Sequence, residues 1–131
     1  MGTVIENDTF TLNVYPEKKM VYHIVHGYLA GTALQELFNR GADEFEKNRC
    51  TKWLSDDRKS TALRKEDLEW TQNNWEPRVL KAGWKYWAIV LPEAVIGQMN
   101  MKPLLDRYSG MGIEVKIFSD PDEGLQWLES V

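Results

Sequence analysis

The stretch of sequence that does most to decide the fold is WKYWAIVL, at residues 84–91. Read as a strand, it carries apolar side chains on both faces, which is typical of a strand buried between two layers in a parallel sheet. Gly83 precedes the run and Pro92 follows it, and both residue types interrupt regular structure. The run therefore predicts an interior strand of a parallel sheet, and with it an α/β fold.

Four further strands can be placed around this run. Residues 20–26 are also apolar on both faces and predict a second interior strand. Residues 9–15 and 113–118 alternate apolar and polar side chains, so they predict half-buried strands at the two edges of the sheet. Residues 51–55 predict a short additional strand. Because only a short turn separates residues 9–15 from 20–26, these two strands should form an antiparallel hairpin.

Apolar residues at helical spacing predict the remaining elements. The predicted helices cover residues 32–45, 65–82, 101–108 and 121–131. The order of elements is then β-β-α-β-α-β-α-β-α. This order predicts one α/β domain over residues 1–131, with a mostly parallel five-stranded sheet and one antiparallel edge strand.

Single residues predict local features of these helices. Gly41, in the middle of the first helix, costs about 1 kcal/mol relative to alanine, which indicates close packing at that position. Pro77 removes a backbone donor and predicts a kink or a restart of the second helix. Asp120 predicts an N-cap for the last helix, with Pro121 at the first helical position.

Composition excludes several classes of function. The chain has 131 residues and a net charge of −4, which argues against a nucleic-acid partner. Its single cysteine, Cys50, excludes an internal disulfide and a cysteine-based zinc site, and its isolation predicts an inert thiol. No apolar run approaches the roughly 18 residues of a membrane span, and the first residues do not resemble a signal peptide. These features predict a cytoplasmic protein.

Polar residues that follow the predicted parallel strands should gather at one edge of the sheet, where open α/β sheets bind their ligands. The residues carried to this edge include His26, Asp56, Asp57, Arg58, Lys59 and Glu93. Such carboxylates and a histidine could perform acid–base chemistry or hold a divalent ion through oxygen atoms. Ordinary polar loop chemistry is the alternative, since no spacing among them is diagnostic. No cofactor is predicted.

Two hydroxyl residues, Ser60 and Thr61, stand between this edge and the second predicted helix. They could present backbone N–H groups to an anion, with Arg58 and Lys59 adding positive charge. Alternatively, they simply cap the helix.

The places of two histidines and one tryptophan on the predicted elements indicate their surroundings. His23 and His26 are three residues apart, so on a strand they face opposite ways, and His23 is expected at the edge of the core. Trp70 lies about 200° around the helix from Leu68, nearly opposite the apolar face. Trp70 therefore predicts either a packing partner in the N-terminal segment or an exposed interaction surface, unless the kink at Pro77 turns the face back.

Three segments also carry a family resemblance. They are KWLSDDRK at residues 52–59, EDLEW at residues 66–70 and KAGWKYWAIVLP at residues 81–92, and they are similar to motifs in small bacterial STAS-like proteins. Over about the whole chain, the element order resembles the SpoIIAA-like fold, which STAS domains share with CRAL-TRIO lipid-transfer proteins.

The resemblance implies a non-catalytic regulatory module that binds a protein partner or a small ligand. In one STAS branch, a serine after the third strand, in an Asp-Ser-Ser-Gly-like motif, is phosphorylated to switch partner binding. Here the matching residues 57–63 read DRKSTAL, so that motif is absent and only Ser60 or Thr61 could be the acceptor.

Two alternatives stand beside the regulatory module: a carrier of a lipophilic small molecule, by analogy with the CRAL-TRIO branch, and an enzyme that uses the acidic edge. An apolar pocket beside Tyr86 or Trp87 would favour the carrier. An exposed apolar patch near Trp70 would favour the interaction module, and a metal at Asp56 and Asp57 the enzyme. The apolar surface at Trp70 and an unpaired edge at residues 10–14 also predict a homodimer.

Overall fold

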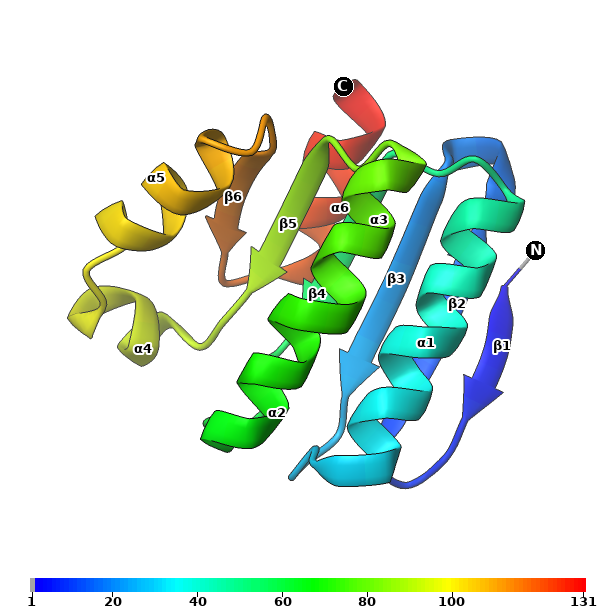
Figure 1. Cartoon of the computed structure of the whole chain (residues 1–131). Coiled ribbons are helices and arrows are strands. Elements are labelled where there is room, and N and C mark those ends of the chain that lie inside the picture. The colour runs from blue at the N-terminus through cyan, green and yellow to red at the C-terminus, as the bar shows by residue number, and fades with distance from the viewer. Residues whose placement is uncertain (1) are drawn as a thin grey trace.

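Six strands form a single sheet in the computed structural model, which describes residues 2–131 (Figure 1). They lie side by side in chain order: β1 (Thr3–Glu6), β2 (Phe10–Tyr15), β3 (Met20–Val25), β4 (Lys52–Asp56), β5 (Tyr86–Val90) and β6 (Glu114–Phe118). The first two pairings are antiparallel, and β3 through β6 are parallel. The prediction of a mostly parallel α/β sheet is therefore confirmed.

Helices cover the two faces of this sheet unequally. On the front face in Figure 1 lie α1 (Gly31–Lys47), α2 (Lys65–Trp70), the π-helical segment η2 (Thr71–Trp75), α3 (Glu76–Ala82) and α5 (Lys102–Ser109). Among the helices of residues 2–131, only α6 (Pro121–Ser130) lies behind the sheet, where it contacts β4, β5 and β6. A 3₁₀ turn, η1 (Pro16–Lys18), joins β2 to β3, and the short helix α4 (Glu93–Gln98) follows β5. No helix of residues 2–131 is long and apolar enough to cross a membrane.

The antiparallel side of the sheet differs from the prediction. The sheet has six strands rather than five, because β1 pairs with β2 and takes the edge position expected for residues 9–15. Thr11 and Asn13, whose side chains suggested a solvent-facing edge, are buried, and the Thr3 hydroxyl donates to Asn13 Oδ1 at 2.8 Å. The alternation therefore marked a buried polar row. Residues 10–14 are therefore paired on both sides, and β1 forms the outer edge of the sheet in their place.

The interior strands agree with the sequence pattern. β3 lies between β2 and β4, and β5 lies between β4 and β6, while β6 forms the far edge as expected. The helix α4 was not predicted. It has only six residues and none of them is buried, so it is too short to show the helical repeat of apolar residues by which an amphipathic helix is recognised.

Two local predictions are confirmed. A Cβ atom built at Gly41 would lie 2.5 Å from Cη2 of Trp53, so α1 approaches the sheet too closely for any side chain there. Asp120 caps α6, because its carboxylate accepts a hydrogen bond from the backbone N–H of Asp122 at 3.0 Å.

The helix expected at residues 65–82 is interrupted by η2, immediately before Pro77 in the first turn of α3. A π-helical segment holds more residues per turn, so it rotates the residues before it relative to those after it. As a result, Trp70 is half-buried against the main core, whereas Leu68 is 45% exposed. Trp70 thus faces the core, which is the outcome that a kink near Pro77 allowed.

Candidate functional site

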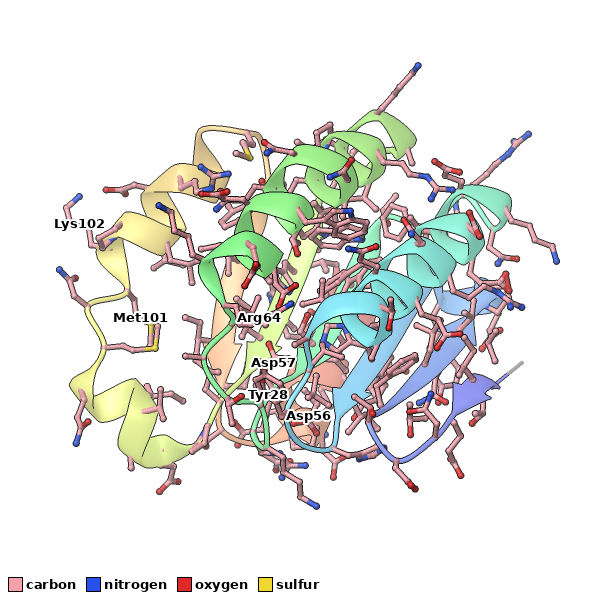
Figure 2. The ribbon with its side chains drawn as sticks, turned by 60° about the horizontal axis from the view of Figure 1, so that its bottom comes forward. Tyr28, Asp56, Asp57, Arg64, Met101 and Lys102 are labelled. Carbon is pink, nitrogen blue, oxygen red and sulfur yellow. The ribbon has the colours of Figure 1, made fainter. Side chains whose placement is uncertain are left out.

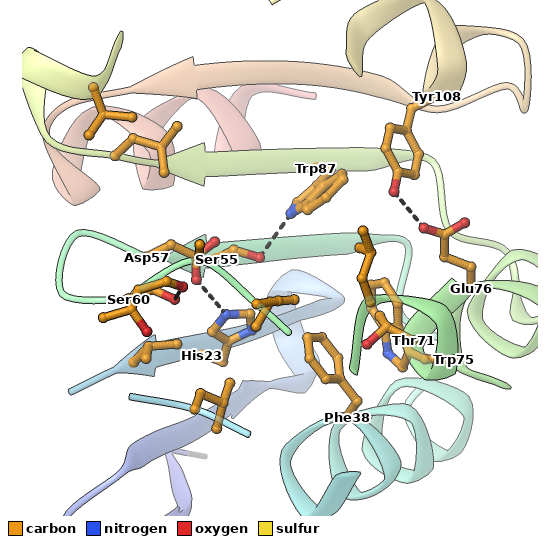
Figure 3. Close-up of a pocket in the computed structure, with 18 of the residues that line it drawn as sticks. His23, Phe38, Ser55, Asp57, Ser60, Thr71, Trp75, Glu76, Trp87 and Tyr108 are labelled. Atoms are coloured by element: carbon orange, nitrogen blue, oxygen red, sulfur yellow. Dashed lines mark hydrogen bonds and ion pairs between the residues drawn. The ribbon is translucent and has the colours of Figure 1, made fainter. Parts of the chain in front are cut away.

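A cavity of about 480 Å³ lies between the front face of the sheet and the helices that cover it (Figure 3). One wall consists of His23 on β3, Ser55 on β4 and Trp87 on β5. These three side chains share a face because the parallel register pairs His23 with Ser55 and Ser55 with Ile89, two residues along β5 from Trp87. Trp75 of η2 and Phe38 of α1 complete much of the opposite wall.

The mouth of the cavity is marked by lining residues that are also exposed. Leu68 on α2 is 45% exposed and Val95 on α4 is 40% exposed, and Thr61 and Ala62 between them are exposed as well. The cavity therefore opens between α2, α4 and residues 57–63, at the carboxyl ends of the parallel strands. Figure 2 shows this end of the molecule.

A chain of hydrogen bonds crosses the wall of the cavity near the mouth. The indole N–H of Trp53 donates to Nδ1 of His23 at 2.9 Å, and Nε2 of His23 lies 3.1 Å from Oδ1 of Asp57. An indole N–H only donates, so Nδ1 must be the unprotonated nitrogen and Nε2–H must donate to Asp57. His23 is thereby held in one tautomer and one orientation.

This arrangement limits the chemistry of His23. Both ring nitrogens are engaged, so no free lone pair faces the cavity to accept a proton from a nucleophile. Ser60 lies on the same wall, but its hydroxyl donates to the Thr61 carbonyl at 3.1 Å rather than to the histidine. The geometry is that of a fixed polar group in a binding site.

Two tryptophans of the walls differ in their polar contacts. The Trp87 N–H donates to the buried hydroxyl of Ser55 at 2.8 Å. The Trp75 N–H is the buried side-chain polar atom without a hydrogen bond among residues 2–131. Trp75 is held instead by ring contacts with Phe38 and Trp53, with centroids 4.8 and 4.9 Å apart. The aromatic walls are thus fixed by packing and by one hydrogen bond.

Among the residues that line the cavity, Glu76 at the start of α3 is a buried carboxylate with both oxygens paired. Glu76 is 4% exposed, and it accepts from the hydroxyl of Tyr108 and, at 2.9 Å, from the guanidinium of Arg107. Burial, and then the neighbouring Glu76, raise the pKa of the Tyr108 phenol. The negative charge of Glu76 is therefore compensated before any ligand enters.

A second buried carboxylate holds α2 against the start of α1. Asp67 accepts from the Arg64 guanidinium at 2.7 Å and from the backbone N–H of Gly31 at 3.1 Å. The hydrogen bond from Arg64, and to a smaller extent that from Gly31, lowers the pKa of Asp67. Gly31 has a φ of 56°, a conformation that disfavours side chains. These contacts fix the helices on one side of the mouth.

The structure brings some of the predicted site residues together at this cavity. Asp57, Ser60 and Thr61 all line it. Ser60 and Thr61 do not cap a helix, because α2 begins only at Lys65 and has no side-chain cap, so the capping prediction is wrong.

Other predicted residues lie elsewhere. Asp56 and Asp57 point to opposite faces of the sheet, as neighbours on a strand must. Asp56 pairs with Arg58 at 2.8 Å, and it contributes, after burial, to raising the pKa of Tyr22 to about 12. His26 hydrogen-bonds Thr11 at 2.7 Å, away from the cavity lining.

The last two predicted residues, Lys59 and Glu93, are exposed and lie outside the lining. No group of three metal-ligating side chains occurs in the described part of the chain. Cys50 is buried, and burial raises its pKa to about 12, so it remains a neutral thiol at pH 7.

Several lining residues were not predicted as site residues: His23, Ser55, Glu76, Trp87 and Tyr108. A signal was present for two of them, since His23 and Ser55 are polar residues on the inner face of otherwise apolar strands. No local signal joins Glu76 to Tyr108, which are 32 positions apart.

No protein-family model, curated protein or solved structure matches this chain. What the protein does must therefore be inferred from the geometry of the cavity.

Proposed function

We propose that this protein binds a small, largely apolar molecule in the cavity between α2, α4 and the sheet. The observation that carries the proposal is a cavity of about 480 Å³ whose walls are mostly apolar and aromatic. Ligand sites typically measure about 300–1,000 Å³ and combine apolar walls with a few fixed polar groups. His23, Ser55 and Asp57 are the fixed polar groups here.

The walls favour an apolar ligand for a physical reason. Water inside the cavity meets few hydrogen-bonding partners on Phe38, Trp75, Trp87 or Leu91, so replacing it with apolar groups is favourable. Because Trp87 and His23 are already held by hydrogen bonds, little side-chain ordering is needed on binding.

This proposal corresponds to the carrier alternative raised by the sequence, for which a pocket beside Trp87 was the discriminating feature. A SpoIIAA-like topology and a STAS-like family membership are part of the same proposal, supported by the element order and the three motifs. The protein-partner role remains a prediction. Trp70, suggested as its surface, is half-buried against the core.

The proposal can be tested with 1-decanol as the probe. Titration calorimetry should show saturable binding to the full chain, and tryptophan fluorescence should change because Trp75 and Trp87 line the cavity. Substituting Leu68→Gln should weaken binding about fivefold, or ~1 kcal/mol, because an apolar wall at the mouth is lost.

Leu105→Gln is the matched control. Leu105 is also a partly exposed leucine on a helix, at 37% exposure, but it lies outside the cavity lining. It should leave decanol binding unchanged. Absence of saturable binding, or equal weakening by both substitutions, would contradict the proposal.

A further inference from the structure

We infer that the cavity selects apolar molecules bearing a neutral or positively charged polar group, and that it discriminates against carboxylates through Asp57. This inference rests on the proposed function and specifies its ligand class. It follows from the charges on the cavity walls and from the hydrogen-bonding capacity that those walls leave unused.

Among the described residues, the cavity lining includes two carboxylates, Asp57 and Glu76, but no lysine or arginine. Both oxygens of Glu76 are occupied, by Tyr108 and Arg107, so its charge is compensated. Asp57 is therefore the charge that a ligand meets.

The arginines near the mouth do not reverse this balance. Arg58 forms two hydrogen bonds to the carboxylate of Asp56, and Arg64 forms two to that of Asp67. Each guanidinium is thus matched by its own carboxylate in the fork geometry that arginine favours.

Helix N-termini carry partial positive charge and often bind anions, so those at this edge could favour an anionic ligand. At α1, the backbone N–H of Gly31 is taken by Asp67. The first turn of α2 contains Glu66 and Asp67, and that of α4 contains Glu93. Acidic side chains therefore already occupy or flank these N-termini.

Asp57 retains the capacity to bind a ligand. Its Oδ1 accepts from His23, and no hydrogen bond from residues 2–131 reaches its Oδ2. Its side chain is 27% exposed, in the wall near the mouth. A hydroxyl or ammonium group can donate to this oxygen while the apolar body lies against Trp87. A carboxylate in the same place would meet like charge.

Three probes of equal chain length test this selection: decylamine, 1-decanol and decanoate. At pH 7 the amine is charged positively and the acid negatively, as lysine and glutamate side chains are. Calorimetry should show decanoate binding about tenfold or more weaker than decanol, with decylamine at least as tight as decanol.

Asp57→Asn is the decisive variant, because it removes the charge but keeps an oxygen that can accept from His23. It should reduce the ratio of decylamine to decanoate affinity about tenfold while leaving decanol binding within about twofold. Asp122→Asn makes the same change of charge on α6, behind the sheet, and should leave the ratio unchanged.

The outcomes separate the two claims. If none of the three probes binds, the proposed function fails. If decanol binds but decanoate binds as tightly as decylamine, the charge selection is overturned and the proposed function stands. If the preference persists in Asp57→Asn, or is lost equally in Asp122→Asn, Asp57 is not its source and the inference is overturned.

Discussion

The two faces of the sheet are packed with side chains of different sizes. The front face is covered with aromatic rings, among them Trp53, Trp75, Trp84 and Tyr108, and it encloses the cavity. Behind the sheet, the fully buried residues are mostly smaller: Met20, Leu54, Ala88, Val90 and Leu128.

The difference shows how a cavity can persist in a folded domain. Large rings locked by edge contacts, such as Trp75 against Trp84 at 5.0 Å, cannot collapse into the space beside them. Behind the sheet, Gly124 lets α6 approach until a Cβ there would lie 3.1 Å from Leu54 and 3.5 Å from Ala88. Small residues thus close one face, and rigid large ones leave space on the other.

The largest effect should come from truncating the closed face. Leu128→Ala should cost about 3 kcal/mol in the free energy of unfolding, since Leu128 is fully buried and its loss leaves a new void. Leu63→Ala, at the cavity wall, should cost only about 1 kcal/mol, because Leu63 is partly exposed and borders space that already exists. Urea denaturation measures both, and equal costs would mean that the faces do not differ in packing.

Adding a methyl group to one helix glycine on each side of the sheet should give a smaller contrast, in which the front face is the more sensitive one. Gly41→Ala should lower the free energy of unfolding by about 2 kcal/mol, because the new Cβ meets the rigid indole of Trp53, which is held by a hydrogen bond to His23. Gly124→Ala should lie within about 0.5 kcal/mol of wild type, since the Leu54 methyl can shift and alanine favours the helix. Thermal denaturation of the pair would refute this contrast if Gly124→Ala were the more damaging change.

The smallest effect at neutral pH concerns one tyrosine on each face. Burial raises the pKa of Tyr22, to about 12, and it also raises the pKa of Tyr108. Each phenol is more easily deprotonated in the unfolded chain, so stability is fully present below about pH 10 and falls as pH rises toward these pKa values.

Ultraviolet titration of the phenolate should therefore show high-pH steps that Tyr22→Phe and Tyr108→Phe remove one at a time. Each substitution should also flatten the loss of stability above about pH 10. A wild-type protein whose stability did not change between about pH 10 and pH 12 would contradict the burial of both rings.

The N-terminal strands show where sequence patterns mislead. Alternation in residues 9–15 correctly indicated a strand, but it could not show whether the polar face met water or another strand. Thr3 lies ten residues from Asn13, and their hydrogen bond became evident only when β1 was placed beside β2. A polar row satisfied by a neighbouring strand has the same pattern as one satisfied by solvent.

The helix predicted at residues 65–82 shows a second limit of sequence patterns. Helical wheel positions assume a constant number of residues per turn, and the π-helical segment η2 breaks that assumption between Leu68 and Val79. The exchange of roles between Leu68 and Trp70 follows from this one local change. Pro77 signalled an irregularity here, but not how far it would rotate the flanking residues.

The sequence by itself determined the alternation of strands and helices, the interior position of β3 and β5, the close approach at Gly41 and the cap at Asp120. These features depend on side-chain periodicity and on the conformational limits of single residues, which are local properties. Only the tertiary structure decided the sixth strand, the cavity, the fixed tautomer of His23 and the pairing of Glu76 with Tyr108. Each of these features depends on how segments far apart in the sequence pack together and which hydrogen-bonding partners they supply. No local pattern encodes that information.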